Sequence, residues 1–124
     1  MAYLIDTHIA LWWLGASPEL SEDLKELLRT EPAVHMSAVT PWEISLKHSL
    51  GKLAEVPGLP ERVRDLQFKP LPITLEHGMH GHALPWLHRD PFDRMLVAQA
   101  QAEDLTIITR DAWIPKYDVQ VLRA

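Results

Sequence analysis

The sequence predicts a single α/β domain built on a parallel sheet. Its 124 residues fit one ordinary domain. Short apolar runs that are typical of buried strands alternate along the chain with stretches whose apolar residues recur at helical spacing. This alternation favours a parallel sheet with helices on both faces. The chain shows no internal repeat, low-complexity segment or linker, so we expect one domain over residues 1–124.

Three elements open the chain. Tyr3–Ile5 is short and apolar, which is typical of a buried strand. Ile9–Leu14 is an apolar stretch that stops at Gly15, and a glycine in this place indicates the end of a helix. From Ser21 onwards leucines fall at helical spacing among charged residues, and the serine is a favourable N-cap.

The middle of the chain continues the alternation. Val34–Ser37 has the pattern of a second strand. Thr40–Leu50 is predicted to be a helix that Gly51 closes. Prolines punctuate the next segment, and a short helix is expected between them over Glu61–Leu66.

The last part of the chain supplies three more strands. Leu71–Ile73 is predicted to be the third strand, although the prolines at positions 70 and 72 argue against a strand there. Leu75–Leu84 and Asp90–Glu103 are predicted helices. Leu105–Thr109 is a clear buried strand, and the strand over residues 119–122 ends the sheet.

The composition excludes several classes of protein. The chain has no cysteine, so disulfides and thiolate metal sites are excluded, and any metal must bind carboxylates or histidines. The net charge of -5 argues against a simple nucleic-acid-binding module, which usually has a basic surface. It does not exclude a nuclease whose acidic site holds cations.

The N-terminal segment predicts a cytoplasmic protein with no membrane partner. Asp6 comes too early for a signal peptide. No apolar run approaches the roughly 20 residues that a membrane helix needs.

Four acidic residues are expected at one edge of the sheet. Asp6 follows the first strand, Asp111 follows the strand that ends at Thr109, and two helices that follow strands begin near Glu43 and Asp93. The carboxyl ends of parallel strands share one edge, where the sites of open α/β sheets lie. Carboxylates are the ligands that Mg²⁺ and Mn²⁺ prefer. A bound metal activates water and stabilises the charge that develops on a phosphate, so the pattern indicates phosphodiester hydrolysis.

Each acid also has a purely structural interpretation. Thr40-Pro41-Trp42-Glu43 has the form of a capping box, and Asp90-Pro91-Phe92-Asp93 is a similar helix start. Asp6 could be an N-cap and Asp111 an ordinary turn residue. The coincidence of all four at one predicted edge favours a functional cluster.

Several neighbours of these acids are candidate substrate-positioning residues. The hydroxyls of Thr7 and Thr109 could orient a carboxylate or could cap the backbone instead. Three arginines border the acids and could hold substrate phosphates or could only balance surface charge; they are Arg89, Arg94 and Arg110. Lys47 lies four residues after Glu43, and we expect an intrahelical ion pair between them.

Histidines and tryptophans receive ordinary interpretations. His77, His80 and His82 are expected on a solvated helix face, with a second metal site as the minor alternative. Four tryptophans are expected in the core or in a subunit interface; they are Trp12, Trp13, Trp42 and Trp86.

Four segments together resemble the PIN-domain ribonucleases, and among them the VapC toxins of bacterial toxin–antitoxin pairs. The segments are Leu4–His8, Ser37–Lys47, Arg89–Ala100 and Leu105–Asp111. They occur in family order, and the resemblance covers essentially the whole chain. No acid of the family pattern is missing.

The resemblance implies a three-layer α/β/α sandwich with a parallel sheet of about five strands. It implies that Asp6 and Asp93 match the principal Mg²⁺ ligands, and that Glu43 and Asp111 match the other acids, which ligate directly or through water. It also implies RNA cleavage as the activity of a toxin, with Mn²⁺ as a plausible substitute metal. The resemblance further implies a homodimer and inhibition by a cognate VapB-like antitoxin.

Two other functions compete with this one. A catalytically silent PIN-like interaction module would not need all four acids. A receiver-like phosphotransfer domain also gathers acids at the carboxyl edge of a parallel sheet. Such a domain needs adjacent acids after an early strand and a lysine after a late one, whereas this chain has Thr109-Arg110-Asp111 there.

Overall fold

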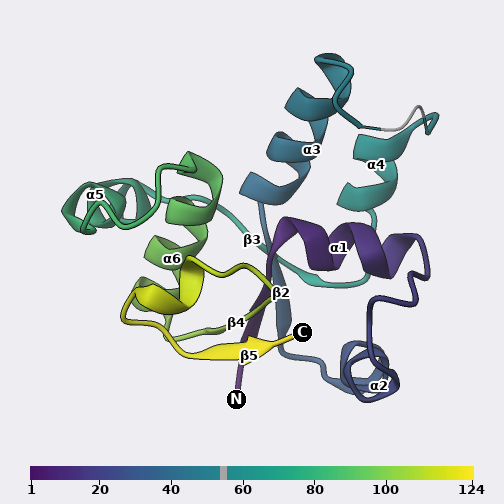
Figure 1. Ribbon diagram of the computed structural model, residues 1–124, viewed down its shortest axis with the longest axis horizontal. Coiled ribbons are helices and arrows are strands. Elements are labelled where there is room, and N and C mark those ends of the chain that lie inside the picture. The colour runs from purple at the N-terminus through teal and green to yellow at the C-terminus, as the bar shows by residue number, and fades with distance from the viewer. Residues whose placement is uncertain (54–55) are drawn as a thin grey trace.

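A five-stranded parallel sheet forms the centre of the computed structural model, which describes residues 1–53 and 56–124 (Figure 1). The strands are β1 (Tyr3–Ile5), β2 (Val34–Ser37), β3 (Lys69–Leu71), β4 (Thr106–Thr109) and β5 (Val121–Arg123). Their order is β3-β2-β1-β4-β5, and every pairing is parallel. Ile5 is in register with Met36 on β2 and with Ile108 on β4, so the central strands end at the same level.

Helices cover both faces of the sheet and make the three-layer sandwich that the sequence predicts. The helices are α1 (Thr7–Leu14), α2 (Glu22–Thr30), α3 (Val39–Ser49), α4 (Leu59–Arg64), α5 (Leu75–Ala83) and α6 (Pro91–Glu103), with a 3₁₀ turn η1 (Ile114–Lys116). Ile5 packs with the apolar residues of α1, α2 and α4. Its neighbour Leu4 points to the opposite face and packs with α6 and η1, as the alternation of a strand requires.

The short helix runs over Leu59–Arg64 instead of Glu61–Leu66, and the last strand over Val121–Arg123 instead of 119–122. Two other predicted boundaries are wrong for identifiable reasons. The third strand runs over Lys69–Leu71, two residues earlier than expected, because Pro70 is tolerated at the edge of the sheet. Helix α3 begins at Val39, where Ser37 Oγ accepts a hydrogen bond from the Val39 amide at 3.0 Å. Thr40 therefore lies inside the helix, and the capping box predicted for Glu43 does not form.

The expectation of a solvated histidine face is wrong for His77. Its side chain is buried, and its Nδ1 accepts the Thr74 amide while Thr74 Oγ1 accepts the amide of His77, which makes a capping box for α5. Trp42 and Trp86 are 59% and 77% exposed, so they lie outside the core, and a subunit interface stays the prediction for them. Among the described residues, no helix has the length and apolar character needed to cross a membrane.

Candidate active site

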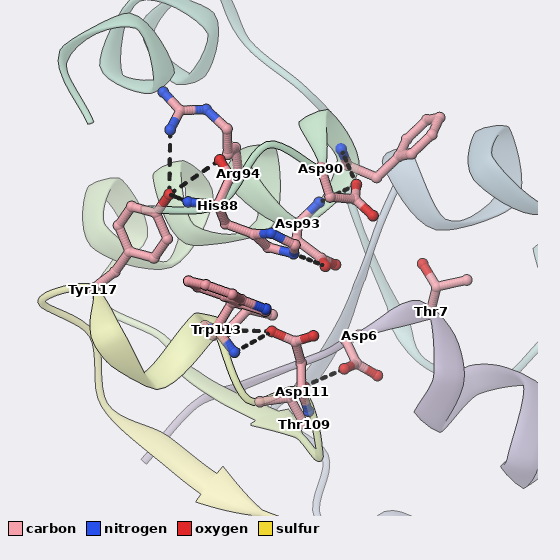
Figure 2. A network of polar contacts seen from close by, with 12 residues as sticks. Asp6, Thr7, His88, Asp90, Asp93, Arg94, Thr109, Asp111, Trp113 and Tyr117 are labelled. Atoms are coloured by element: carbon pink, nitrogen blue, oxygen red, sulfur yellow. Dashed lines mark hydrogen bonds and ion pairs between the residues drawn. The ribbon is translucent and has the colours of Figure 1, made fainter. Parts of the chain in front are cut away.

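Three of the four predicted acids converge beyond the carboxyl ends of β1 and β4. These two strands are neighbours, so Asp6 and Asp111 leave the sheet side by side. The N-terminal turn of α6 brings Asp93 to the same place. Figure 2 shows the three carboxylates turned toward a common space. Their charges act on one another, because Asp6 and Asp111 both raise the pKa of Asp93.

Asp6 is at once a helix cap and a member of the cluster. Its Oδ1 accepts the Ile9 amide at 2.9 Å, which caps α1, and its Oδ2 accepts a hydrogen bond from Thr109 Oγ1. The side chain is buried, and this burial raises the pKa of the Asp6 carboxyl despite the two hydrogen bonds that lower it. Asp6 is therefore the N-cap of α1 through Oδ1, and this contact does not prevent its carboxylate from also belonging to the acidic cluster.

Asp93 carries an unfavourable charge at neutral pH. Burial raises the pKa of its carboxyl to about 7, and the neighbouring charge of Asp90 adds to the effect. Asp90 is the N-cap of α6, as expected, and accepts the amides of Phe92 and Asp93. Asp93 itself makes no such cap, since its Oδ2 contacts His88 Nε2 at 2.9 Å.

His88 is a contact of the cluster that sequence reasoning missed. Its ring stacks on Trp113, with planes 14° apart and centroids separated by 5.8 Å, and its backbone amide donates to the Tyr117 hydroxyl at 2.9 Å. This scaffold holds the imidazole against Asp93 (Figure 2). The position of a histidine five residues before Asp93, in the loop entering α6, was the available signal.

Glu43 lies on α3, in the second turn, and is buried. Thr7 Oγ1 donates to its Oε1 at 2.6 Å, and Lys47 Nζ pairs with its Oε2 at 2.7 Å. The predicted intrahelical ion pair is thus confirmed. The hydrogen bond from Glu43 raises the pKa of Lys47, and the charges of Asp90 and Asp93 act in the same direction.

Asp111 caps the 3₁₀ turn η1. Its Oδ2 accepts the amides of Trp113 and Ile114, each at 2.8 Å, which is the structural alternative that the sequence left open. Its own amide donates to Thr109 Oγ1 at 2.9 Å. Thr109 thereby ties Asp111 to Asp6, because the same hydroxyl donates to the Asp6 carboxylate.

The three arginines proposed to hold substrate lie in different environments. The Arg94 guanidinium is buried and does not reach the cluster. It donates to the carbonyl oxygens of Gly81, Leu84 and Pro85 and to the Tyr117 hydroxyl.

The other two arginines lie nearer the surface. Arg110 pairs with Glu19, and its guanidinium lies 4.6 Å from the ring centroid of Trp12. Arg89 is exposed beside Asp90, so it is open to an approaching ligand.

The residues present fit a divalent cation. The cluster offers carboxylate oxygens, the hard donors that Mg²⁺ and Mn²⁺ take. It also gathers negative charge in a buried place, which is the cause of the raised pKa values of Asp6 and Asp93. Donor atoms of His88, Asp90 and Asp93 lie within 4.8 Å of one another. A cation among these groups would relieve their repulsion.

Comparisons with known proteins identify a family and several similar folds. The family model described as the PIN domain matches residues 3–120. No curated protein matches the sequence. Similar solved structures include VapBC2 from Rickettsia felis bound to a DNA fragment from its promoter, with a TM-score of 0.76, 14% identity and coverage of 100% of this chain and 99% of that chain.

Two further structures resemble this fold over nearly their whole length. A toxin–antitoxin complex from Klebsiella pneumoniae has a TM-score of 0.68 and 20% identity, with 98% of this chain and 96% of that chain covered. VapBC-5 from Mycobacterium tuberculosis, a member of the VapBC family of toxin–antitoxin systems, has a TM-score of 0.63 and 17% identity, with 99% and 98% covered. At these identities the likeness is one of fold.

Proposed function

This chain belongs to the PIN-domain family, and we propose that it is a Mg²⁺- or Mn²⁺-dependent endoribonuclease acting as the toxin of a toxin–antitoxin pair. One observation carries the proposal: Asp6, Asp93 and Asp111 face a common space, and burial, together with the charges of Asp90, Asp111 and Asp6, raises the pKa of Asp93 to about 7. Such a cluster is costly to fold without cations, and a metal-dependent phosphodiesterase has a use for it.

The chain's own residues have separate roles in this proposal. Asp6 and Asp93 are the principal ligands, and Glu43 and Asp111 complete the set directly or through water. Thr109 orients Asp6, and Thr7 orients Glu43 through a hydrogen bond of 2.6 Å. When bound, a divalent cation supplies Lewis acidity that activates water and stabilises the charge developing on the phosphate.

Arg89 is the arginine best placed to contact RNA. It is exposed and adjoins Asp90 at the start of α6. The side chains of Arg94 and Arg110 are engaged within the protein, so they shape the walls of the site in this proposal.

The proposed partners are a VapB-like antitoxin and a second copy of this chain. Support for the antitoxin comes from the similar folds, which include a toxin–antitoxin complex and VapBC assemblies. Exposed apolar side chains on α5, Leu75 at 89% and Met79 at 76%, are compatible with a further protein contact.

Cleavage of RNA by the purified protein, with Mg²⁺, with Mn²⁺ and with a chelator, tests the function. We expect cleavage that needs the metal and that is lost in Asp6→Asn and in Asp93→Asn. Asparagine at position 6 can still cap α1, so the fold should survive the change. Asp23→Asn, which removes one exposed carboxylate from α2, is the matched control and should cleave like the parent.

The opposite results are equally clear. Equal cleavage by the parent, Asp6→Asn and Asp93→Asn would identify a contaminating nuclease and refute the assignment. A folded parent that binds neither Mg²⁺ nor Mn²⁺ at millimolar concentration would instead favour a silent interaction module.

A further inference from the structure

Both carboxylate oxygens of Glu43 already have a partner. Thr7 Oγ1 donates to Oε1 at 2.6 Å, and the Lys47 ammonium holds Oε2 at 2.7 Å. The Glu43 side chain is 5% exposed, so the pair is shielded from solvent. Each oxygen keeps a second lone pair, but the positive charge of Lys47 beside Oε2 repels a cation that approaches Glu43, so ligation by Glu43 is opposed until the ammonium moves away.

Lys47 is the partner that can leave. Thr7 is buried in the first turn of α1, and its hydroxyl also lies 3.4 Å from Thr40 Oγ1. The Lys47 side chain is 38% exposed and flexible. Its ammonium can move into water while its aliphatic stem keeps its contacts. The exchange of Lys47 for a metal leaves the Thr7–Glu43 hydrogen bond intact.

The Lys47 charge acts on more of the cluster than Glu43 alone. The carboxylates of Asp90 and Asp93, at the start of α6, also attract it. Among residues 1–53 and 56–124, it is the one lysine or arginine that forms an ion pair with any of the four acids. The Lys47 ammonium is thus a positive charge that the chain itself supplies to these acids.

We propose that Lys47 is the built-in counterion of the acidic cluster: its ammonium competes with a divalent cation for Glu43 and, once displaced, contacts a phosphate of the bound RNA. The second half rests on the proposed ribonuclease function, whereas the competition for Glu43 does not. A displaced ammonium stays tethered to α3 by its own side chain and stays under the attraction of Asp90 and Asp93, at the start of α6. It is therefore available to a phosphate that approaches these acids.

Calorimetric titration of the whole protein with Mn²⁺ tests the competition. Lys47→Gln should bind Mn²⁺ roughly fivefold more tightly than the parent, because the competing charge is gone. Lys47→Arg, which keeps the charge, should bind like the parent. Lys25→Gln is the matched control, since it breaks an exposed intrahelical pair with Glu22 on α2, a helix that contributes none of the four acids.

A purely structural ion pair predicts that Lys47→Gln does not increase the affinity for Mn²⁺. If Lys47→Gln folds and binds Mn²⁺ as the parent does or more weakly, the competition is refuted. Circular dichroism checks the fold, and Lys47→Met, which keeps an aliphatic stem, replaces glutamine if that variant unfolds.

RNA cleavage at saturating Mn²⁺ tests the phosphate contact. Loss of a charge-assisted hydrogen bond should lower kcat/KM of Lys47→Gln roughly tenfold, and Lys47→Arg should recover part of the loss. Tighter metal binding together with slower cleavage is the expected signature. Unchanged kcat/KM in Lys47→Gln would overturn the contact. If the parent itself does not cleave RNA, the ribonuclease proposal and the phosphate contact fail together, and the Mn²⁺ titrations still decide the competition.

Discussion

Asp93 shows how a single carboxylate can link the stability of a protein to its function. Its side chain is 18% exposed and lies next to Asp90, and the negative charges of Asp111 and Asp6 repel it as well. In an unfolded chain the pKa of an aspartate is about 3.9. In the folded protein the pKa of Asp93 is about 7, so the folded state holds this proton more tightly. The ionised form of Asp93 therefore opposes folding when no cation is bound nearby.

Asp93→Asn should stabilise the metal-free protein above pH 7. Because the folded state binds the extra proton, the contribution of Asp93 to the free energy of unfolding falls as the pH rises from about 4 to about 7. Asparagine carries no charge, so the variant should exceed the parent by about 1–3 kcal/mol at pH 8 and by little at pH 4. Urea unfolding with a chelator present measures the difference. A variant less stable than the parent at pH 8 would show that the Asp93 charge is not penalised.

Thr109→Val should weaken metal binding and destabilise the fold together. The Thr109 hydroxyl donates to Asp6 and accepts the Asp111 amide, and valine has nearly the same shape. Its loss leaves buried polar groups without a partner, which costs about 1–3 kcal/mol. It also removes a hydrogen bond that lowers the pKa of Asp6, so Mn²⁺ binding should shift to higher pH. Thr109→Ser should restore both properties, and a parent-like Mn²⁺ titration of the valine variant would contradict this role.

At the scale of secondary structure, α6 has two functions. Its first turn presents Asp93 to the cluster, with Asp90 as the N-cap. One residue further, the buried Arg94 donates to carbonyl oxygens of the loop before the helix and to Tyr117. Tyr117 in turn accepts the His88 amide, and His88 contacts Asp93. The helix thus positions its acid and also anchors the loop that supports this acid.

Arg94→Met and Arg89→Gln should separate anchoring from substrate contact. Arg94→Met leaves buried carbonyl oxygens without a donor and should lower the free energy of unfolding by about 2–4 kcal/mol. Arg89 is exposed, so Arg89→Gln should leave stability unchanged and raise KM for RNA. Denaturant unfolding and cleavage kinetics of both variants check this. Parent-like stability with impaired RNA binding in Arg94→Met would place its guanidinium against substrate instead.

At the scale of the whole molecule, the sheet brings together acids that are far apart in the sequence. Asp6 and Asp111 are neighbours because β1 and β4 pair in parallel, with Ile5 opposite Ile108. Asp93 joins them from the first turn of α6. The folded state alone brings these three acids together, so a cation that binds them must favour folding.

Divalent metal should therefore raise the melting temperature, and more at pH 8 than at pH 5. A ligand at 100 times its Kd stabilises the folded state by about 2.7 kcal/mol. At pH 5 Asp93 is protonated, because its pKa is about 7, and the proton competes with the metal. Thermal unfolding with and without Mn²⁺ at both pH values measures the effect, with Asp6→Asn as the control that should respond weakly. An equal shift at both pH values would mean that Asp93 is not a ligand.

The sequence by itself determined the class of fold and the edge of the sheet at which the acids gather. Hydrophobic periodicity indicates strands and helices locally, and parallel strands place their carboxyl ends at one edge whatever the details of packing. Asp6 after β1 and Asp111 after β4 needed no more information than this.

Only the tertiary structure decided which partner each acid has. Asp93 contacts His88 because Trp113 and Tyr117, from a distant part of the chain, hold the loop that carries His88. Arg94 turns inward because it donates hydrogen bonds to buried carbonyl oxygens there. Both oxygens of Glu43 are occupied because α1 packs against α3 and brings Thr7 to one of them. These contacts depend on the distances between packed elements, and neither spacing nor local propensity encodes those distances.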